Sequence, residues 1–251
     1  MSVAPASARA EFAALVSPPR FELKARPGER LRQVFDIEHA GAKTGRYRIY
    51  TNDWQLDASG GPVFQDALAP ESCRPWVVLE RRELALGPGA KHRFRFEIEP
   101  PAETPARECR FAIMIEGLEA AQTGGALNVS VAGRIAVIVY VSVGAAAPRL
   151  ELVSSGVSDY GGALLPMLEI ANRGNAHGRL GGYVELRAAD GSRIEASPQD
   201  VPILPGTTRR VLLVPTAPQE RWTTLLRYPL RLSGAVEASA GKLALEVEFR
   251  P

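Results

Sequence analysis

Residues suited to acid–base, metal or redox chemistry are few and scattered in this sequence. The histidines are His39, His92 and His177, and the cysteines are Cys73 and Cys109. His92 lies in the alternating stretch KHRFRFEIE, which is typical of a solvent-facing strand position, and His177 lies in the turn-like stretch NRGNAHGR. No Cys/His cluster has the spacing of a zinc site, so we expect no metal. The cysteines form either a disulfide, which would suit an oxidising compartment, or two buried free thiols.

Signatures of catalysis are also missing from the chain. It has no GxSxG elbow, no P-loop and no HExxH motif. The carboxylates Glu80 and Glu83 stand beside Arg81 and Arg82 in ERREL, and we interpret them as a solvated charged face. A catalytic triad can be assembled from distant positions, but nothing here favours one. We therefore expect a protein that is not an enzyme and that uses no cofactor.

Length and composition set broad limits on the fold and the partners. The chain has 251 residues, of which 45% are hydrophobic and 23% charged, which suits one large or two ordinary globular domains. Its net charge of +2 gives no reason to expect nucleic acid or an anionic membrane as a partner. The longest apolar run, Ile135–Val141, has the length of a strand, so no membrane span is predicted. We expect residues 1–17 to be a flexible segment without an intact signal peptide, although Ala4–Ala10 would suit the remainder of one.

Period-two alternation and turn signals predict an all-β chain with two domains. Helical periodicity is nearly absent, and Glu11–Val16 is at most one helical turn. Pro-Gly pairs at 27–28, 88–89 and 205–206 each precede an expected strand and favour a tight turn with a positive φ at the glycine. The segment Gly144–Pro148 separates two sets of short strands, and this predicts domains at 18–145 and 148–251.

The expected strands of the two domains are as follows. The first domain has them at 20–25, 31–38, 46–51, 76–79, 92–98, 110–116 and 127–141, and the second at 150–153, 165–171, 182–187, 193–196, 208–214, 225–232 and 243–249.

The stretch ALNVSVAGRIAVIVYVSVG changes its pattern halfway along. Leu127, Val129 and Val131 alternate strictly with polar residues, which indicates a strand with one apolar face. From Ile135 to Val141 the apolar run is unbroken, which indicates a strand that is buried on both faces.

Several segments, in order, resemble the PapD-like periplasmic chaperones of the chaperone–usher pathway. The resemblance covers residues 18 to 251 and rests on NDWQLDASGG, SCRPWVVLERRELALGPGAKHRFRFEIEPP, ECRFAIMIEG, GRIAVIVYV, LEIANRGNAHGRLGG and ILPGTTRRVLLVP. It implies two immunoglobulin-like β-sandwiches in a boomerang arrangement. It also implies a periplasmic protein that binds pilus or fibre subunits by donor-strand complementation and delivers them to an outer-membrane usher. A further candidate partner is a second copy of the chain, in a homodimer whose binding strands cover each other.

In such chaperones an edge strand is lent to the open core of a subunit. Leu127, Val129 and Val131 fall where the donor residues of the family lie, just upstream of the stretch RIAVIVYV. The other interpretation is an ordinary core strand whose apolar face packs on its own sheet. A donor strand would be exposed or capped in a dimer, whereas a core strand would be buried.

The basic anchor of the family is not retained in register. Family members hold the subunit's terminal carboxylate with an arginine on the first strand and a lysine on the last strand of the first domain, and Leu23 and Ala136 stand at these positions. Arg20, Lys24 and Arg134 are close in sequence and could act as a substitute anchor, or they could be solvated surface charges.

A second class of function fits the same fold. An exported two-domain immunoglobulin-like adhesion or structural module would act through surface contacts and would not lend a strand. Such a module should bury the strand at 127–131.

Overall fold

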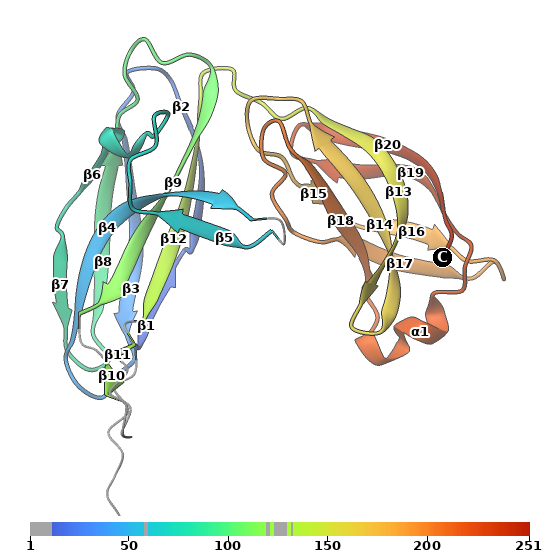
Figure 1. Cartoon of the computed structure of the whole chain (residues 1–251), viewed down its shortest axis with the longest axis horizontal. Coiled ribbons are helices and arrows are strands. Elements are labelled where there is room, and N and C mark those ends of the chain that lie inside the picture. The colour runs from blue at the N-terminus through green and yellow to red at the C-terminus, as the bar shows by residue number, and fades with distance from the viewer. Residues whose placement is uncertain (1–11, 58–59, 119–120, 123–129, 132) are drawn as a thin grey trace, which may run out of the picture. The chain divides into compact units, whose positions relative to one another are not determined.

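The computed structural model describes residues 12–57, 60–118, 121–122, 130–131 and 133–251 (Figure 1). Apart from the helix α1 (Trp222–Leu225) and the 3-10 turns η1 (Arg74–Trp76) and η2 (Gln219–Arg221), the regular elements of these residues are all strands. The all-β class predicted from the sequence is therefore confirmed. No helix in the described part is long and apolar enough to cross a membrane.

The chain divides into two compact units. The first comprises the described residues up to Pro105 together with Cys109–Gly144, and the second comprises Ala106–Glu108 together with Ala145–Pro251. The boomerang arrangement implied by the resemblance stays a prediction.

The first unit contains twelve strands within the described residues, although residues 107–108, at the start of the ninth strand, fall in the second unit. They are β1 (Ala14–Ser17), β2 (Arg20–Ala25), β3 (Leu31–His39), β4 (Gly45–Leu56), β5 (Pro62–Gln65), β6 (Val77–Leu79), β7 (Glu83–Leu86), β8 (Lys91–Ile98), β9 (Arg107–Gly117), β10 (Ala121–Gln122), β11 (Ser130–Val131) and β12 (Arg134–Val143).

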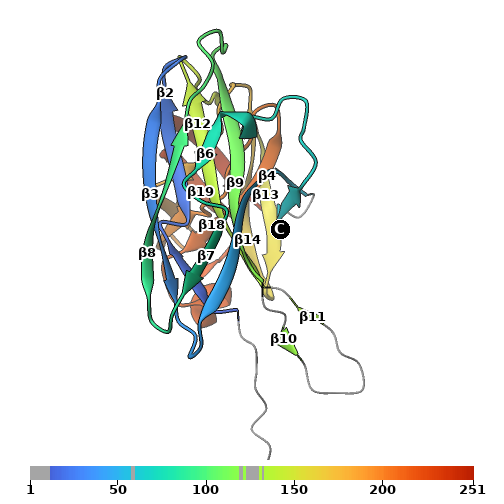
Figure 2. The same cartoon turned by 90° about the vertical axis from the view of Figure 1, so that its left-hand side faces the viewer.

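Two sheets enclose the core of this unit. One has the order β1-β3-β8-β6, and the other has the order β2-β12-β9-β4-β5 with β7 also pairing β4. Figure 2 shows β2, β12 and β9 side by side in the second sheet. Alternate residues of each strand point into the space between the sheets, so Phe94, Phe96 and Ile98 of β8 and Val137 and Val139 of β12 are all buried.

A disulfide joins Cys73 and Cys109 across this core. Cys73 immediately precedes η1 and Cys109 lies in β9, with 6.1 Å between their Cα atoms. Both side chains are buried within the apolar cluster of the first unit.

The second unit contains β13 (Leu150–Tyr160), β14 (Ala163–Asn172), β15 (Leu180–Gly181), β16 (Val184–Arg187), β17 (Arg193–Pro198), β18 (Thr208–Pro215), β19 (Leu230–Ala238) and β20 (Gly241–Phe249). Their order is β13-β14-β18-β17-β16-β19-β15, with β20 pairing β19. They enclose a separate apolar core that includes Leu165, Ile170, Leu213 and Phe249, each of which is fully buried.

Two local features differ from the sequence analysis. Glu11–Val16 has the pattern of at most one helical turn, but from Ala14 onward the chain forms β1, which pairs antiparallel with β3. Strand pairing contributes more than a weak helical preference over so few residues. The one-turn helix α1 was not expected, because four residues leave no periodic pattern to detect.

Candidate functional site

The candidate site is the edge of β12 that precedes its pairing with β2. These two strands pair in parallel from Ile138 opposite Arg20 to Val143 opposite Ala25. Upstream of Arg20 the chain leaves this edge, because β1 pairs with β3 in the other sheet. In the described part of the chain, residues 134–137 of β12 therefore have no strand on this edge, while their other edge faces β9.

An open strand edge offers unpaired main-chain donors and acceptors to an incoming strand. Arg134 is exposed at the start of this edge, and Ile135 and Ala136 are half-buried. Burial on both faces of β12 begins further along, with Val139, Tyr140 and Val141 all buried. The unbroken apolar run is thus buried on both faces of the strand only in its second half. Its first half lies along the open edge and is only partly covered.

Two of the three predicted donor residues, Leu127 and Val129, lie outside the described residues. Val131 belongs to β11, which pairs with β10 so that Val131 stands opposite Ala121. The donor role and the core-strand alternative both stay predictions.

The three candidate anchor residues are not brought together. Arg20 is exposed on β2 and forms an ion pair with Glu22 at 3.1 Å. Lys24 is exposed opposite Ser142, whereas Arg134 begins β12. From 134 to 142 is eight residues of strand, which corresponds to about 26 Å at the usual rise. One carboxylate cannot contact both Lys24 and Arg134 in this register.

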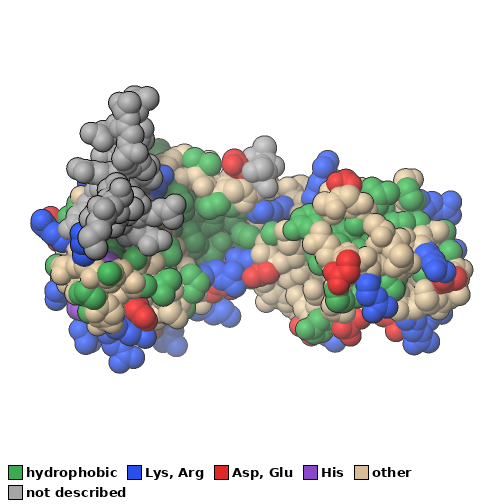
Figure 3. Space-filling model, turned by 90° about the horizontal axis from the view of Figure 1, so that it is seen from below, with side chains coloured by type: hydrophobic (Ala, Val, Ile, Leu, Met, Phe, Trp, Pro, Cys, Tyr) green, Lys and Arg blue, Asp and Glu red, His purple; other side chains and the backbone are tan. Residues whose placement is uncertain are grey.

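One of the two positions at which the resemblance implies a basic anchor, Leu23, is apolar for a structural reason. Leu23 stands opposite Val141 and packs against the buried core of the first unit. A cation in its place would lose hydration against that core. On the face shown in Figure 3, basic and acidic side chains both occur.

The structure pairs each histidine with a partner. His92 Nε2 lies 2.6 Å from Glu80 Oε1. Although burial by itself raises the pKa of Glu80, the hydrogen bonds from His92 and from the main-chain N–H of Arg95 outweigh it, and the pKa is lowered overall. His39 is buried, and its ring nitrogens contact the Tyr47 hydroxyl and the Lys43 carbonyl oxygen.

The pair formed by His177 and Glu108 was missed by sequence reasoning. His177 Nδ1 lies 2.5 Å from Glu108 Oε2, the same oxygen accepts the His177 main-chain N–H at 2.9 Å, and both side chains are buried. The residues are 69 positions apart, so no spacing rule could have joined them. Among the described residues no group of three or more His, Cys, Asp or Glu side chains is arranged to hold a metal ion.

Comparison with protein-family models gives no match, and no curated protein matches the sequence. Solved structures of fimbrial chaperones are similar to the chain over nearly its full length. The class 5 fimbriae chaperone CfaA is 12% identical with a TM-score of 0.46, and the match covers 95% of this chain and 99% of that one. The YadV chaperone is 10% identical with a TM-score of 0.48, covering 96% and 100%. The CupB2 chaperone of Pseudomonas aeruginosa is 10% identical with a TM-score of 0.47, covering 94% and 100%.

Proposed function

We propose that this protein is a periplasmic chaperone that stabilises pilus or fibre subunits by lending them a strand and then delivers them to an outer-membrane usher. The observation that carries the proposal is the open edge of β12 at residues 134–137, which is separated by two residues from the alternating stretch LNVSV. Few proteins leave such an edge beside an apolar stretch without a use for it, because it invites aggregation.

The alternation of β12 indicates which side chains a client would receive. Ile135 and Val137 pack toward the core of the first unit. If residues 127–131 extend β12 when a client binds, Leu127, Val129 and Val131 share that same face. They would then complete a client core that lacks one strand, and the main chain would supply the ladder hydrogen bonds.

The energy available is adequate for capture. Burial of each of these three side chains contributes about 1.5–3 kcal/mol before the cost of ordering the segment. The disulfide between Cys73 and Cys109 supports export, because such bonds persist in oxidising compartments.

The decisive test replaces Leu127, Val129 and Val131 together by serine. The triple variant and the wild type are each produced in a bacterial periplasm with a pilus subunit that lacks its last strand, and the complexes are purified. We expect the variant to keep its melting temperature and to lose the subunit. The matched control changes Asn128 and Ser130 to alanine, because in a strand that extends β12 these side chains would point the opposite way and should leave capture intact.

Undiminished recovery of the subunit with the triple variant would overturn the proposal. A triple variant that unfolds would also count against it, because that is the result expected of the adhesion or structural module, in which this segment is an ordinary core strand.

A further inference from the structure

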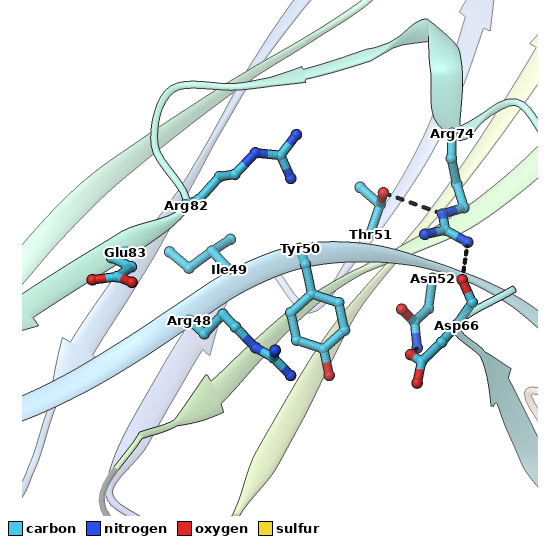
Figure 4. Close-up of a pocket in the computed structure, with 9 residues that line it drawn as sticks. All are labelled: Arg48, Ile49, Tyr50, Thr51, Asn52, Asp66, Arg74, Arg82 and Glu83. Atoms are coloured by element: carbon cyan, nitrogen blue, oxygen red, sulfur yellow. Dashed lines mark hydrogen bonds between the residues drawn. The ribbon is translucent and has the colours of Figure 1, made fainter. Parts of the chain in front are cut away.

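A pocket of about 510 Å³ opens on the first unit, away from the β12 edge. It is centred on β4, which is separated from β12 by β9 in the sheet. Figure 4 shows the residues that line it, three of which are arginines: Arg48, Arg74 and Arg82.

The pocket lies at a break in the pairing of β4. On one edge β4 pairs continuously with β9 from Tyr47 to Asn52. On the other edge β7 pairs with residues 45–48 and β5 pairs with residues 53–56. Residues 49–52 are left between these two partners, a gap of about 13 Å at the usual rise per residue.

Thr51 presents its main chain to this gap. The N–H of Ile49 donates to the Arg82 carbonyl oxygen at 2.8 Å, so Ile49 directs its main-chain groups toward the β7 side. In an antiparallel ladder every second residue faces the same edge, so the N–H and C=O of Thr51 face the gap as well. Within the described residues no strand pairs with Thr51 on that edge.

The arginines differ in what they already bind. Arg74 closes one end of the gap, because its guanidinium donates to the Asp66 carbonyl oxygen at 2.9 Å and to Thr51 Oγ1 at 3.3 Å. Arg48 donates to Glu116 at 2.6 Å. Arg82 is exposed, and among the described residues its guanidinium has no hydrogen bond or ion pair. Figure 4 shows it extending along the pocket toward Thr51.

A second polar group lacks a partner at the same place. Asn52 is only 1% exposed, and its Nδ2 donates to Asp66 Oδ1 at 2.9 Å. Its Oδ1 has no hydrogen-bond partner. Buried polar atoms are nearly always satisfied, so this acceptor is an unsatisfied group in the wall of the pocket.

The unpaired groups decide the class of ligand. A simple anion would suit Arg82 and the Thr51 N–H, but it would meet the Thr51 carbonyl oxygen with like partial charge. A peptide main chain has both donors and acceptors in the spacing of a strand. An acidic side chain on that peptide would pair with Arg82.

We propose that this pocket binds a short extended peptide segment of three or four residues, which adds to the open edge of β4 at Thr51 and places an acidic side chain against Arg82. The site is separate from the β12 edge, so the inference does not depend on the proposed function. If the proposed function also holds, the first unit binds two extended segments on two different strand edges.

The test is a titration of the isotope-labelled full chain, followed by nuclear magnetic resonance. The probes are the pentapeptide acetyl-Thr-Val-Glu-Val-Thr-amide, its counterpart with Gln in place of Glu, and glutarate as a free dicarboxylate. We expect saturable shifts of the Thr51 amide with the Glu peptide and slower hydrogen exchange at that amide. Affinity should fall by about tenfold for the Gln peptide and for Arg82→Gln, the effect expected for one hydrogen bond to a charged group.

The matched control is Arg81→Gln, because Arg81 is an exposed neighbour that pairs with Glu80 and does not line the pocket. This variant should bind the Glu peptide as the wild type does. An unshifted Thr51 amide at saturating peptide would overturn the proposal, and so would equal affinity for the Glu and Gln peptides. Glutarate that reproduces the shifts with the affinity of the peptide would also overturn it, since the site would then bind anions alone.

Discussion

The N–H of Ile138 donates to the carbonyl oxygen of Pro19 over 3.0 Å, and at this bond β2 begins to cover the edge of β12. Everything upstream of it on β12 is open on that side within the described chain. A single position in the register thus separates the part of β12 that has a strand on both edges from the part that has β9 alone as its neighbour within the described residues. Predictions about client capture depend on which side of Ile138 a residue lies.

Arg134 and Lys24 should differ in their effect on capture. Arg134→Ala is expected to weaken subunit binding, because Arg134 stands on the open edge, upstream of Ile138. Lys24→Ala should leave it unchanged, because Lys24 lies beside Ser142 at the far end of the paired region. Calorimetric titration of both variants with a purified subunit measures this difference. Equal losses for the two variants would contradict the register argument.

A lysine at position 136 should strengthen binding. Ala136 is half-buried on the open edge, and a lysine there could lie along the strand with its ammonium group in water. We expect Ala136→Lys to bind a subunit with a free terminal carboxylate about tenfold more tightly than Ala136→Gln, which has no charge. A subunit with an amidated terminus should not distinguish the two variants, and a preference that survives amidation would rule out a carboxylate contact.

Loss of the disulfide should destabilise the first unit. The bond joins residues 36 positions apart in the buried core, so it restricts the unfolded chain considerably. Changing Cys73 and Cys109 to alanine should lower the free energy of unfolding by about 2–4 kcal/mol. Urea denaturation with and without a reductant measures this, and the reductant should lower the stability of the wild type while leaving that of the variant unchanged. A wild type that is equally stable with the bond reduced would contradict the prediction.

Ionisation of Tyr228 should make the free energy of unfolding depend on pH in the alkaline range. Burial raises the pKa of its phenol from 10.0 to about 12, and its hydroxyl donates to the Leu164 carbonyl oxygen at 2.7 Å. The folded state therefore holds the proton more tightly than the unfolded state does. The resulting stabilisation is complete below pH 10 and declines as the pH rises from 10 toward 12.

The control for this prediction is Tyr228→Phe. Its free energy of unfolding should fall less than that of the wild type between pH 10 and 11.5. In the ultraviolet titration of the folded protein, the phenol that ionises near 12 should be missing from the variant. Parallel stability curves for the two proteins would show that Tyr228 ionises freely in the folded state.

The sequence by itself determined the all-β class and several of the strands and turns, although β1, β5 and β7 were not expected and the strand expected at 225–232 lies at 230–238 as β19. Alternation along β8 predicted the burial of Phe94, Phe96 and Ile98. The Pro-Gly pairs predicted glycines with positive φ, and Gly28 and Gly89 have φ values of 74° and 66°. Both signals depend only on neighbouring residues, because side-chain alternation and turn stereochemistry are local properties of the chain.

The tertiary structure alone decided which distant residues meet. The parallel register of β2 and β12 places Lys24 and Arg134 at opposite ends, although both are basic residues near the expected anchor positions. Glu108 reaches His177 across 69 positions, and the unpaired edge at Thr51 exists only because β5 and β7 stop on either side of it. Strand order and register follow from the packing of whole sheets, and no local pattern in one strand specifies the strand that will lie beside it.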